Sequence, residues 1–282
     1  MIKHILAASR PKTLVAAIIP PIVAHGLLIN LYDKTSYLYL SLCLGASLLI
    51  QLATNFYNDA VDAIKGADTD RVGPRRVSSS GDVSIKTTML WGHVSIALAS
   101  IIGVFLFLRG GPVVLVLGVL SLYLSYGYTG GPLPLAYKGL GELFVFLFFG
   151  LFAVCGSFYL YSLELPPIVF LVASQIGLLS TSLIMINNLR DRKTDKVVGK
   201  RTMATRVPVR VYVYSLYASL ILPYLGLYIL KAWAPLLALP LLMKVLNIIK
   251  NNKDGAILNE ALKFAGIHLL VFGLALFGSF IS

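Results

Sequence analysis

The chain has 282 residues, of which 57% are hydrophobic and 13% are charged, and its formal net charge is +12. A mean hydropathy of +0.83 excludes an ordinary soluble domain and is typical of a protein that crosses a membrane several times. The positive charge does not indicate a nucleic-acid-binding protein. The sequence has no RNP, zinc-finger or basic-helix pattern, and its basic residues flank apolar runs.

Nine apolar segments follow one another along the chain, and most reach the ~20 residues that a helix needs to cross a bilayer. No polar stretch between them is long enough to form a second domain. We therefore expect an all-α, polytopic membrane protein with nine transmembrane helices, in a single domain over 1–282. Prolines at 20–21, 223 and 240 predict kinks in the first, seventh and eighth helices. The segments are about 13–30, 37–60, 87–108, 112–128, 140–161, 166–188, 209–230, 232–249 and 258–281.

The distribution of Lys and Arg predicts how these helices are oriented in the membrane. With nine spans, 21 of the 24 basic residues fall on the side that carries the N-terminus, and three fall on the other side. Because basic residues concentrate in cytoplasmic loops, the sequence predicts a cytoplasmic N-terminus and an outward C-terminus. We expect the protein in the cell (plasma) membrane, with the lipid bilayer as its surroundings and no obligate protein partner.

Six of the twelve carboxylates gather in two stretches, 55–70 and 187–195, each at the end of a long apolar segment. Carboxylates near a membrane are costly to place, so two such clusters predict a functional site. In the first stretch, Asn55, Asp59 and Asp62 are spaced to share one face of a helix.

The second stretch repeats this pattern, with Asn187, Asp191 and Asp195 spaced four residues apart. The pair Asn58 and Asp62 has the same four-residue spacing in the first stretch. Several carboxylates on one helix face repel each other unless a cation lies between them, and hard oxygen ligands of this kind suit Mg²⁺. Both stretches lie on the predicted cytoplasmic side, at the ends of the second and sixth helices. This suggests two related halves around a shared site facing the cytoplasm.

The loops after the two acidic stretches are rich in Lys and Arg. Metal ions held by carboxylates, together with such basic loops, suit a diphosphate. They would also stabilise the diphosphate as a leaving group. Since the tail of the substrate would lie in the membrane, the sequence predicts a site for a lipid diphosphate.

An aromatic-rich region follows the fourth helix, around the Gly-Pro-rich loop from Tyr126 to Lys138. Aromatic faces stabilise cations, which an allylic carbocation would need. At the start of the first helix, Arg10 and Lys12 either anchor the helix at lipid headgroups or hold a carboxylate or phosphate of a substrate. The candidates for binding the acceptor or stabilising a cation are Arg10, Lys12, Asn55, Tyr126, Tyr128 and Asn187.

Two motifs in this sequence resemble those of a known family. The pattern Asn58-Asp59-x-x-Asp62 with Lys65-Gly66-x-Asp68, and Asp191-x-x-x-Asp195 with Gly199-Lys-Arg-Thr, is similar to the two aspartate motifs of the UbiA superfamily of intramembrane prenyltransferases. The resemblance narrows to the dihydroxynaphthoate prenyltransferases of menaquinone synthesis and runs from Arg10 to about Arg206. It rests on Arg10-Pro-Lys-Thr-Leu, Asp70-Arg-x-Gly-Pro, Tyr128-Thr-Gly-Gly-Pro-x-Pro-Leu-Ala-Tyr137-x-Gly-Leu-Gly-Glu142 and Asn187-Asn-x-Arg-Asp191.

The resemblance implies nine helices around a central cavity, capped on the cytoplasmic side by loops at about 61–86 and 189–208. It implies transfer of a polyprenyl chain from polyprenyl diphosphate to 1,4-dihydroxy-2-naphthoate with loss of the carboxylate, giving demethylmenaquinone. The implied Mg²⁺ and diphosphate site consists of Asn58, Asp62, Asp191 and Asp195, with Asp59, Asp68 and Asn187 in support. We take Asp59, Asp62, Asp191 and Asp195 as the catalytic acids. We take Lys65, Arg71, Arg75, Lys138, Lys196 and Arg201 as the diphosphate contacts.

Two alternatives remain at this point. One is a UbiA-type enzyme with another acceptor, such as hydroxybenzoate, a chlorophyll precursor, haem or a glycerol phosphate ether. The other is a cation-coupled transporter. A transporter usually places its polar residues near the bilayer midplane. Here the acids lie at helix ends on one side, which favours the enzyme.

Overall fold

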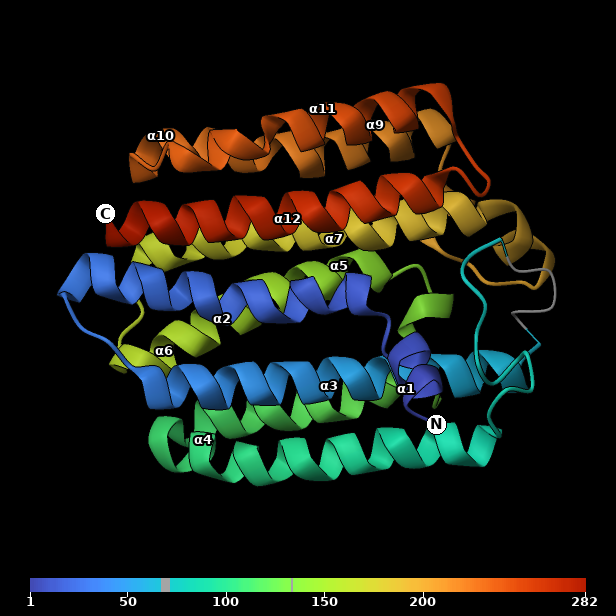
Figure 1. Ribbon diagram of the computed structural model, residues 1–282, viewed down its shortest axis with the longest axis horizontal. Coiled ribbons are helices and arrows are strands. Elements are labelled where there is room, and N and C mark those ends of the chain that lie inside the picture. The colour runs from blue at the N-terminus through green and yellow to red at the C-terminus, as the bar shows by residue number, and fades with distance from the viewer. Residues whose placement is uncertain (67–71, 133) are drawn as a thin grey trace.

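The computed structural model describes all residues of the chain except 67–71 and 133, and the regular secondary structure of the described residues is entirely helical. Eight of the described helical segments are long and apolar enough to cross a membrane. They run alongside one another as a bundle, with the two chain termini at opposite ends (Figure 1). The predicted all-α membrane fold is therefore confirmed. The eight segments are α2 (Pro11–Tyr32), α3 (Tyr37–Ile64), α4 (Ile85–Gly127), Gly141–Ser162, α7 (Pro167–Val197), Val209–Leu230, Ala234–Asn251 and α12 (Leu258–Ile281).

Three of these segments change helix type along their length. Gly141–Ser162 consists of α5 (Gly141–Val145), the π-helix η2 (Phe146–Cys155) and α6 (Gly156–Ser162). Val209–Leu230 consists of α9 (Val209–Ile221), η3 (Leu222–Leu225) and α10 (Gly226–Leu230), and Ala234–Asn251 consists of η4 (Ala234–Ala238) and α11 (Leu239–Asn251). Pro223 lies in η3, at the place where its sequence predicts a disturbed helix.

α4 combines the third and fourth predicted segments in one element. Its backbone leaves the helical region at Gly111, where φ is 67° and ψ is −155°. Such a conformation is open to glycine and strained for other residues, and the following Pro112 has no amide hydrogen to donate. α4 is therefore two helical segments that meet at Gly111.

Contacts at the two ends of α4 show that it turns back on itself. Near its start, Thr88 accepts a hydrogen bond from Ser78, whose backbone amide is bonded to Asp59 of α3. Just beyond its end, Thr129 donates to Asn58, which is also on α3. Both ends of α4 therefore lie beside the acidic end of α3, and Figure 1 shows the bend at the opposite end of the bundle.

The acidic ends of α3 and α7 lie at the same end of the bundle, together with the N-terminus (Figure 1). α3 continues to Ile64 and α7 to Val197, so the motif acids from Asp59 to Asp62 and from Asp191 to Asp195 all lie on helices. The short elements α1 (Ile2–Ser9), η1 (Leu135–Tyr137) and α8 (Met203–Arg206) complete the described structure. α1, which precedes the first apolar run, was not among the predicted helices.

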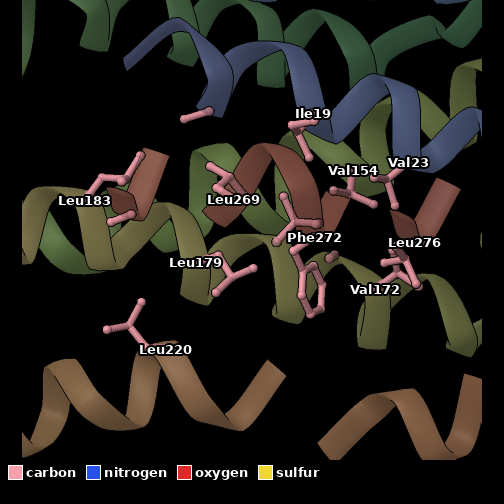
Figure 2. Packing of buried hydrophobic residues seen from close by; sticks show 14 of the residues in the cluster. Ile19, Val23, Val154, Val172, Leu179, Leu183, Leu220, Leu269, Phe272 and Leu276 are labelled. Atoms are coloured by element: carbon pink, nitrogen blue, oxygen red, sulfur yellow. The ribbon is translucent and has the colours of Figure 1, made fainter. Parts of the chain in front are cut away.

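The hydrophobic core holds α7 and α12 against their neighbours. Figure 2 shows side chains of α2, η2, α7, α9 and α12 that meet in this core. Two glycines let η2 approach α7 closely, since a Cβ added at Gly150 would lie 2.5 Å from the Cα of Gly177. This packing positions both the aromatic side chains of η2 and the second acidic helix end. The labelled core residues are Ile19, Val23, Val154, Val172, Leu179, Leu183, Leu220, Leu269, Phe272 and Leu276.

Candidate active site

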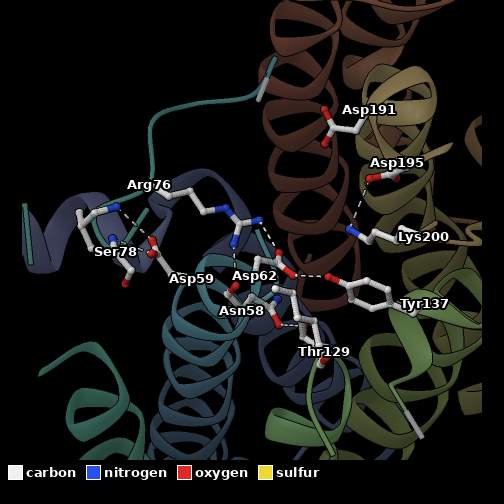
Figure 3. A network of polar contacts seen from close by, with 12 residues as sticks. Asn58, Asp59, Asp62, Arg76, Ser78, Thr129, Tyr137, Asp191, Asp195 and Lys200 are labelled. Carbon is white, nitrogen blue, oxygen red and sulfur yellow. Dashed lines mark hydrogen bonds and ion pairs between the residues drawn. The ribbon is translucent and has the colours of Figure 1, made fainter. Parts of the chain in front are cut away.

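A polar cavity of about 260 Å³ lies between the acidic ends of α3 and α7, and we call it the polar chamber. Its lining combines acids from both helices with basic side chains from three parts of the chain. Figure 3 shows the acids of the two helices at the same end of the bundle. The charged and amide residues of the lining are Arg10, Lys12, Asn58, Asp59, Asp62, Arg75, Arg76, Asn187, Asn188, Arg190, Asp191 and Lys200.

Asp62 is the central acid of the first helix end. Its Oδ1 accepts a hydrogen bond from the Tyr137 hydroxyl at 3.0 Å, and its Oδ2 lies 3.1 Å from Nη2 of Arg76. Arg76 also donates to the backbone oxygen of Asn58 at 2.8 Å. The side chains of Asp62 and Arg76 are 5% and 8% exposed, so this is a buried ion pair. Breaking such a pair leaves an uncompensated buried charge.

The loop after α4 is tied to the same helix end. The Thr129 hydroxyl donates to Oδ1 of Asn58, and Nζ of Lys65 donates to the backbone oxygen of Thr129 at 2.6 Å. Lys65 also lies over the Tyr137 ring, 4.1 Å from its centroid. Burial lowers the pKa of Lys65, and the nearby Asp62 carboxylate opposes this shift. These contacts hold Tyr137 and Thr129 where they can support the acids.

Asp59 has a different environment from Asp62. Although it lines the polar chamber, its carboxylate accepts hydrogen bonds from the backbone amides of Val77 at 3.3 Å and Ser78 at 2.9 Å. Ser78 in turn donates to Thr88 at 3.0 Å. Asp59 therefore anchors the loop that carries Arg76, and its contribution to the chamber is at least partly structural.

The second helix end carries its counter-ions differently. Arg190 contacts the neighbouring Asp191 through two bonds of 2.7 Å and 2.6 Å, and it donates to Asn259 of α12 at 2.7 Å. Asp195 lies 3.7 Å from Nζ of Lys200. Its other oxygen, Oδ2, is buried and has no hydrogen-bond partner among the residues that the structure describes.

The donor groups fit a divalent cation that is shared with a phosphate ligand. Within the described part of the chain, no three His, Cys, Asp or Glu side chains are grouped closely enough to hold a metal ion alone. However, Mg²⁺ is usually bound by one or two carboxylates together with substrate phosphates and water. Asp62 and Asp191 supply one carboxylate from each side of the chamber. Asp195 is not part of the lining, but it lies about one helical turn beyond Asp191 on α7, and its unpartnered Oδ2 is a further oxygen.

Two further cavities connect the polar chamber to the apolar interior of the helix bundle. A second cavity of about 170 Å³ shares Arg10, Thr13, Asn58, Tyr128 and Asn187 with the chamber. A third, of about 380 Å³, shares lining with the second and is mostly apolar, with side chains from α3, α4 and η2. The shared lining of the second and third cavities is Ile50, Gln51, Ser121, Phe148 and Phe149. The three cavities together suit an amphiphile with an anionic head and an apolar tail.

Of the six residues predicted to bind the acceptor or stabilise a cation, five line the chamber or the second cavity. Arg10, Lys12, Tyr128 and Asn187 line the polar chamber, whereas Asn55 lines the second cavity. Asn55 donates to the Ser9 backbone oxygen at 2.8 Å, which ties α3 to the segment before Arg10. Burial and the charge of Glu142 raise the pKa of Tyr128, so its hydroxyl stays protonated. Tyr126 is not part of either lining; its ring lies edge-on to Tyr57, with centroids 5.4 Å apart.

Some of the predicted diphosphate contacts lie at the chamber, and others lie away from it. Lys65 lies beside the Asp62 pair, and Arg75 lines the chamber while it forms a 2.7 Å ion pair with Asp82. Lys138, Lys196 and Arg201 are exposed and are not among the residues that line the chamber. Arg71 and Asp68 lie outside the described residues.

Four residues that sequence reasoning did not select contact the acids directly: Arg76, Tyr137, Arg190 and Lys200. Arg190 has a signal in the sequence, because it directly precedes Asp191. Lys200 and Arg76 lie in loops that were recognised as basic, but neighbouring cations were preferred in each loop. Only the folded chain shows which basic residue of each loop turns inward.

The fold and the chamber define an integral, multi-pass membrane protein in which two acidic helix ends and several basic side chains line one polar chamber. The sequence model of the UbiA prenyltransferase family matches residues 17–270, so the chain belongs to this family.

Two of its relatives are similar to this chain over nearly their whole length. The chain is 32% identical to the 1,4-dihydroxy-2-naphthoate octaprenyltransferase of Mycobacterium tuberculosis, with 97% of this chain and 95% of the relative covered. It is 33% identical to the protein of the same name from Escherichia coli K12, with coverage of 96% and 94%. The predicted superfamily is thereby confirmed.

Among solved structures, a UbiA homologue from Archaeoglobus fulgidus bound to GPP and Mg²⁺ is similar with a TM-score of 0.65 and 16% identity. The match covers 98% of this chain and 99% of that one. The apo structure of a UbiA homologue from Aeropyrum pernix K1 has a TM-score of 0.68 and 17% identity, with coverage of 92% and 96%. These likenesses confirm the fold.

Proposed function

We propose that this protein transfers a polyprenyl chain from polyprenyl diphosphate to 1,4-dihydroxy-2-naphthoate with release of CO₂ and diphosphate. The direct product is the quinol form of demethylmenaquinone, which becomes the quinone by a separate oxidation. The observation that carries the proposal is the polar chamber, in which Asp62 and Asp191 from two helices line one cavity together with basic side chains. The naphthoate acceptor is supported by the names of relatives that are similar over almost the whole chain.

The chain's own residues bind and position the substrates. When bound, Mg²⁺ would neutralise the diphosphate and stabilise it as a leaving group, held by Asp62, Asp191, Asp195 and Asn58. Lys200 and Arg75 face the remaining phosphate charge from the chamber lining. The prenyl tail extends through the second cavity into the apolar third one, and the aromatic rings of η2 shield the allylic carbon from water.

Arg10 and Lys12 are placed to bind the carboxylate of the acceptor. Both line the chamber, and Arg10 also lines the second cavity. An Arg pairs well with a carboxylate because its planar group donates two parallel hydrogen bonds. The neutral hydroxyl of Tyr128, in the lining of both cavities, is available to hydrogen-bond an acceptor oxygen.

We further propose nine membrane crossings in a single domain over 1–282, with α4 crossing twice because it breaks at Gly111. The N-terminus and the chamber would face the cytoplasm of a cell whose plasma membrane holds the protein. The support is the excess of Lys and Arg on that side. Labelling of single cysteines introduced at Ser36 and Ser80 in intact cells tests this orientation, since only the residue at 36 should react with an impermeant reagent.

The activity is tested with the full chain purified in detergent, labelled polyprenyl diphosphate and a series of acceptors. We expect product with 1,4-dihydroxy-2-naphthoate and none after chelation of divalent metal. Product with hydroxybenzoate, a chlorophyll precursor, haem or a glycerol phosphate ether instead would assign another acceptor. Transfer in detergent, where no sealed compartment exists, also separates an enzyme from a cation-coupled transporter.

A further inference from the structure

Glu142 is a partly buried acid that lies outside both aspartate motifs. It is located in α5, and its Oε1 accepts hydrogen bonds from Nδ2 of Asn188 at 2.9 Å and from the Tyr212 hydroxyl at 2.7 Å. Asn188 lies on α7, three residues before Asp191, and it lines the polar chamber. Glu142 is not part of that lining, so it reaches the chamber through Asn188.

The contact with Glu142 decides which end of the Asn188 amide faces the chamber. An asparagine side chain ends in an NH₂ group that donates and a carbonyl oxygen that accepts. Oε1 of Glu142 accepts, so it holds the NH₂ end of Asn188. The carbonyl oxygen Oδ1 is then the end that remains for the chamber, and no hydrogen bond to it occurs among the described residues.

The position of Asn188 favours a cation over the aromatic acceptor as the partner of this oxygen. Asn188 lines the polar chamber but not the second cavity, whereas its neighbour Asn187 lines both. Asn188 therefore lies on the side of the diphosphate head, about one helical turn from Asp191. Neutral carbonyl oxygens are hard ligands that Mg²⁺ accepts directly or through its bound water.

We propose that Glu142 is a positioning residue that turns Oδ1 of Asn188 into the chamber, where Asn188 is a further oxygen ligand for the divalent cation. This inference rests on the proposed function. It assigns roles to Glu142 and Asn188, neither of which is a carboxylate of the two aspartate motifs. A residue that orients a metal ligand in this way typically changes metal affinity by about 10–100-fold when it is removed.

Binding of Mn²⁺ measures the effect without catalysis. The full chain, purified in detergent, is titrated with Mn²⁺ in the presence of inorganic pyrophosphate, and free Mn²⁺ is followed by electron paramagnetic resonance. We expect Glu142→Ala and Asn188→Ala each to weaken Mn²⁺ binding by about tenfold or more. The double variant should bind Mn²⁺ within about twofold of Asn188→Ala alone, because Glu142 acts through Asn188.

Two matched controls separate positioning from general stability. Glu142→Gln keeps a carbonyl oxygen for Asn188, and we expect Mn²⁺ affinity within about threefold of the wild type. Tyr212→Phe removes the other hydrogen bond to the same oxygen of Glu142. It should lower the melting temperature while Mn²⁺ affinity stays within about twofold of the wild type. If Glu142→Ala does not yield folded protein, Glu142→Met replaces it in the same cycle.

Wild-type Mn²⁺ affinity in Glu142→Ala would overturn the inference, as would losses in the double variant that simply add. So would a loss in Glu142→Gln as large as that in Glu142→Ala. In each of these cases tight wild-type binding leaves the proposed function intact. A wild-type protein that does not bind Mn²⁺ with pyrophosphate would overturn both.

Discussion

The two acidic helix ends carry similar residues, yet they neutralise their charge by different routes. At the end of α3, the counter-ion of Asp62 is Arg76, which comes from the loop after the helix. At the end of α7, the counter-ion of Asp191 is the adjacent Arg190, which binds it through two hydrogen bonds and is itself held by Asn259. The first pair requires an ordered loop, whereas the second is built into two packed helices.

The loop that carries Arg76 is itself held in place by contacts with two helices, α3 and α12. The loop with Arg76 is ordered through Asp59, which binds the amides of Val77 and Ser78. It is also linked to α12, because Asn259 donates to the backbone oxygen of Val72 at 3.4 Å. Asn259 therefore links the loop that carries Arg76, through Val72, to the end of α7, through Arg190.

The largest effect on the rate of prenyl transfer should come from replacing a single acid at either helix end. We expect Asp62→Asn and Asp191→Asn each to lower the rate of prenyl transfer by about 100-fold or more, because each removes charge that stabilises the leaving diphosphate. The measurement is product formation with labelled polyprenyl diphosphate in detergent. If one variant retained more than about a tenth of the activity, the two helix ends would not act as equal parts of one site.

A smaller effect, on stability, should distinguish the two counter-ions. Arg76→Met leaves Asp62 buried without its cation, which costs about 3–5 kcal/mol in comparable pairs. Arg190→Met should cost less, because the Asp191 side chain is 18% exposed and water can reach it, whereas the Asp62 side chain is 5% exposed. The unfolding temperature in detergent should therefore be lower for Arg76→Met than for Arg190→Met.

Arg75 provides the control for this ranking. It neighbours Arg76 but is 71% exposed and pairs with Asp82 on the surface. Such pairs contribute about 0–1 kcal/mol, so Arg75→Met should leave the unfolding temperature nearly unchanged. Equal losses for Arg75→Met and Arg76→Met would contradict the assignment of Arg76 as the buried counter-ion.

The smallest effect concerns the basic loop after α7. Lys200 lines the chamber near Asp195, whereas Lys196 is exposed. Because a charge-assisted contact is worth about 1.5–3 kcal/mol, Lys200→Gln should raise the KM for polyprenyl diphosphate about tenfold. Lys196→Gln should change this KM by less than about threefold. A large effect of Lys196→Gln would mean that this loop closes further over bound substrate.

Much of the fold follows from local sequence pattern. Apolar runs of the length of a bilayer predicted every long helix, and the break in α4 falls at Gly111-Pro112, between two predicted segments. The acids at positions 59, 62, 191 and 195 are on helices, as their spacing predicted. The short helix α1 was not predicted, because it is too short for a periodic apolar pattern to be recognised.

The choice among basic residues could not be read from the sequence. Arg75 and Arg76 are adjacent and chemically identical, but the Arg75 side chain is 71% exposed, whereas the Arg76 side chain is buried against Asp62. Lys196 and Lys200 lie four residues apart, and of the two only Lys200 lines the chamber, whereas Lys196 is exposed. Which of them turns inward depends on how the loop is anchored, and that anchor is provided by residues distant in the sequence.

By itself, the sequence determined that this protein is a helical membrane protein with two acidic helix ends. Those properties depend on hydrophobicity and on spacing along one helix, which are local. Only the tertiary structure decided that Arg76, Arg190 and Lys200 neutralise the acids, and that Glu142 reaches the chamber through Asn188. The pairs Arg76–Asp62 and Glu142–Asn188 join side chains from different segments, and Arg190 is held beside Asp191 by Asn259 of α12. These contacts depend on how the helices pack rather than on any single stretch of sequence.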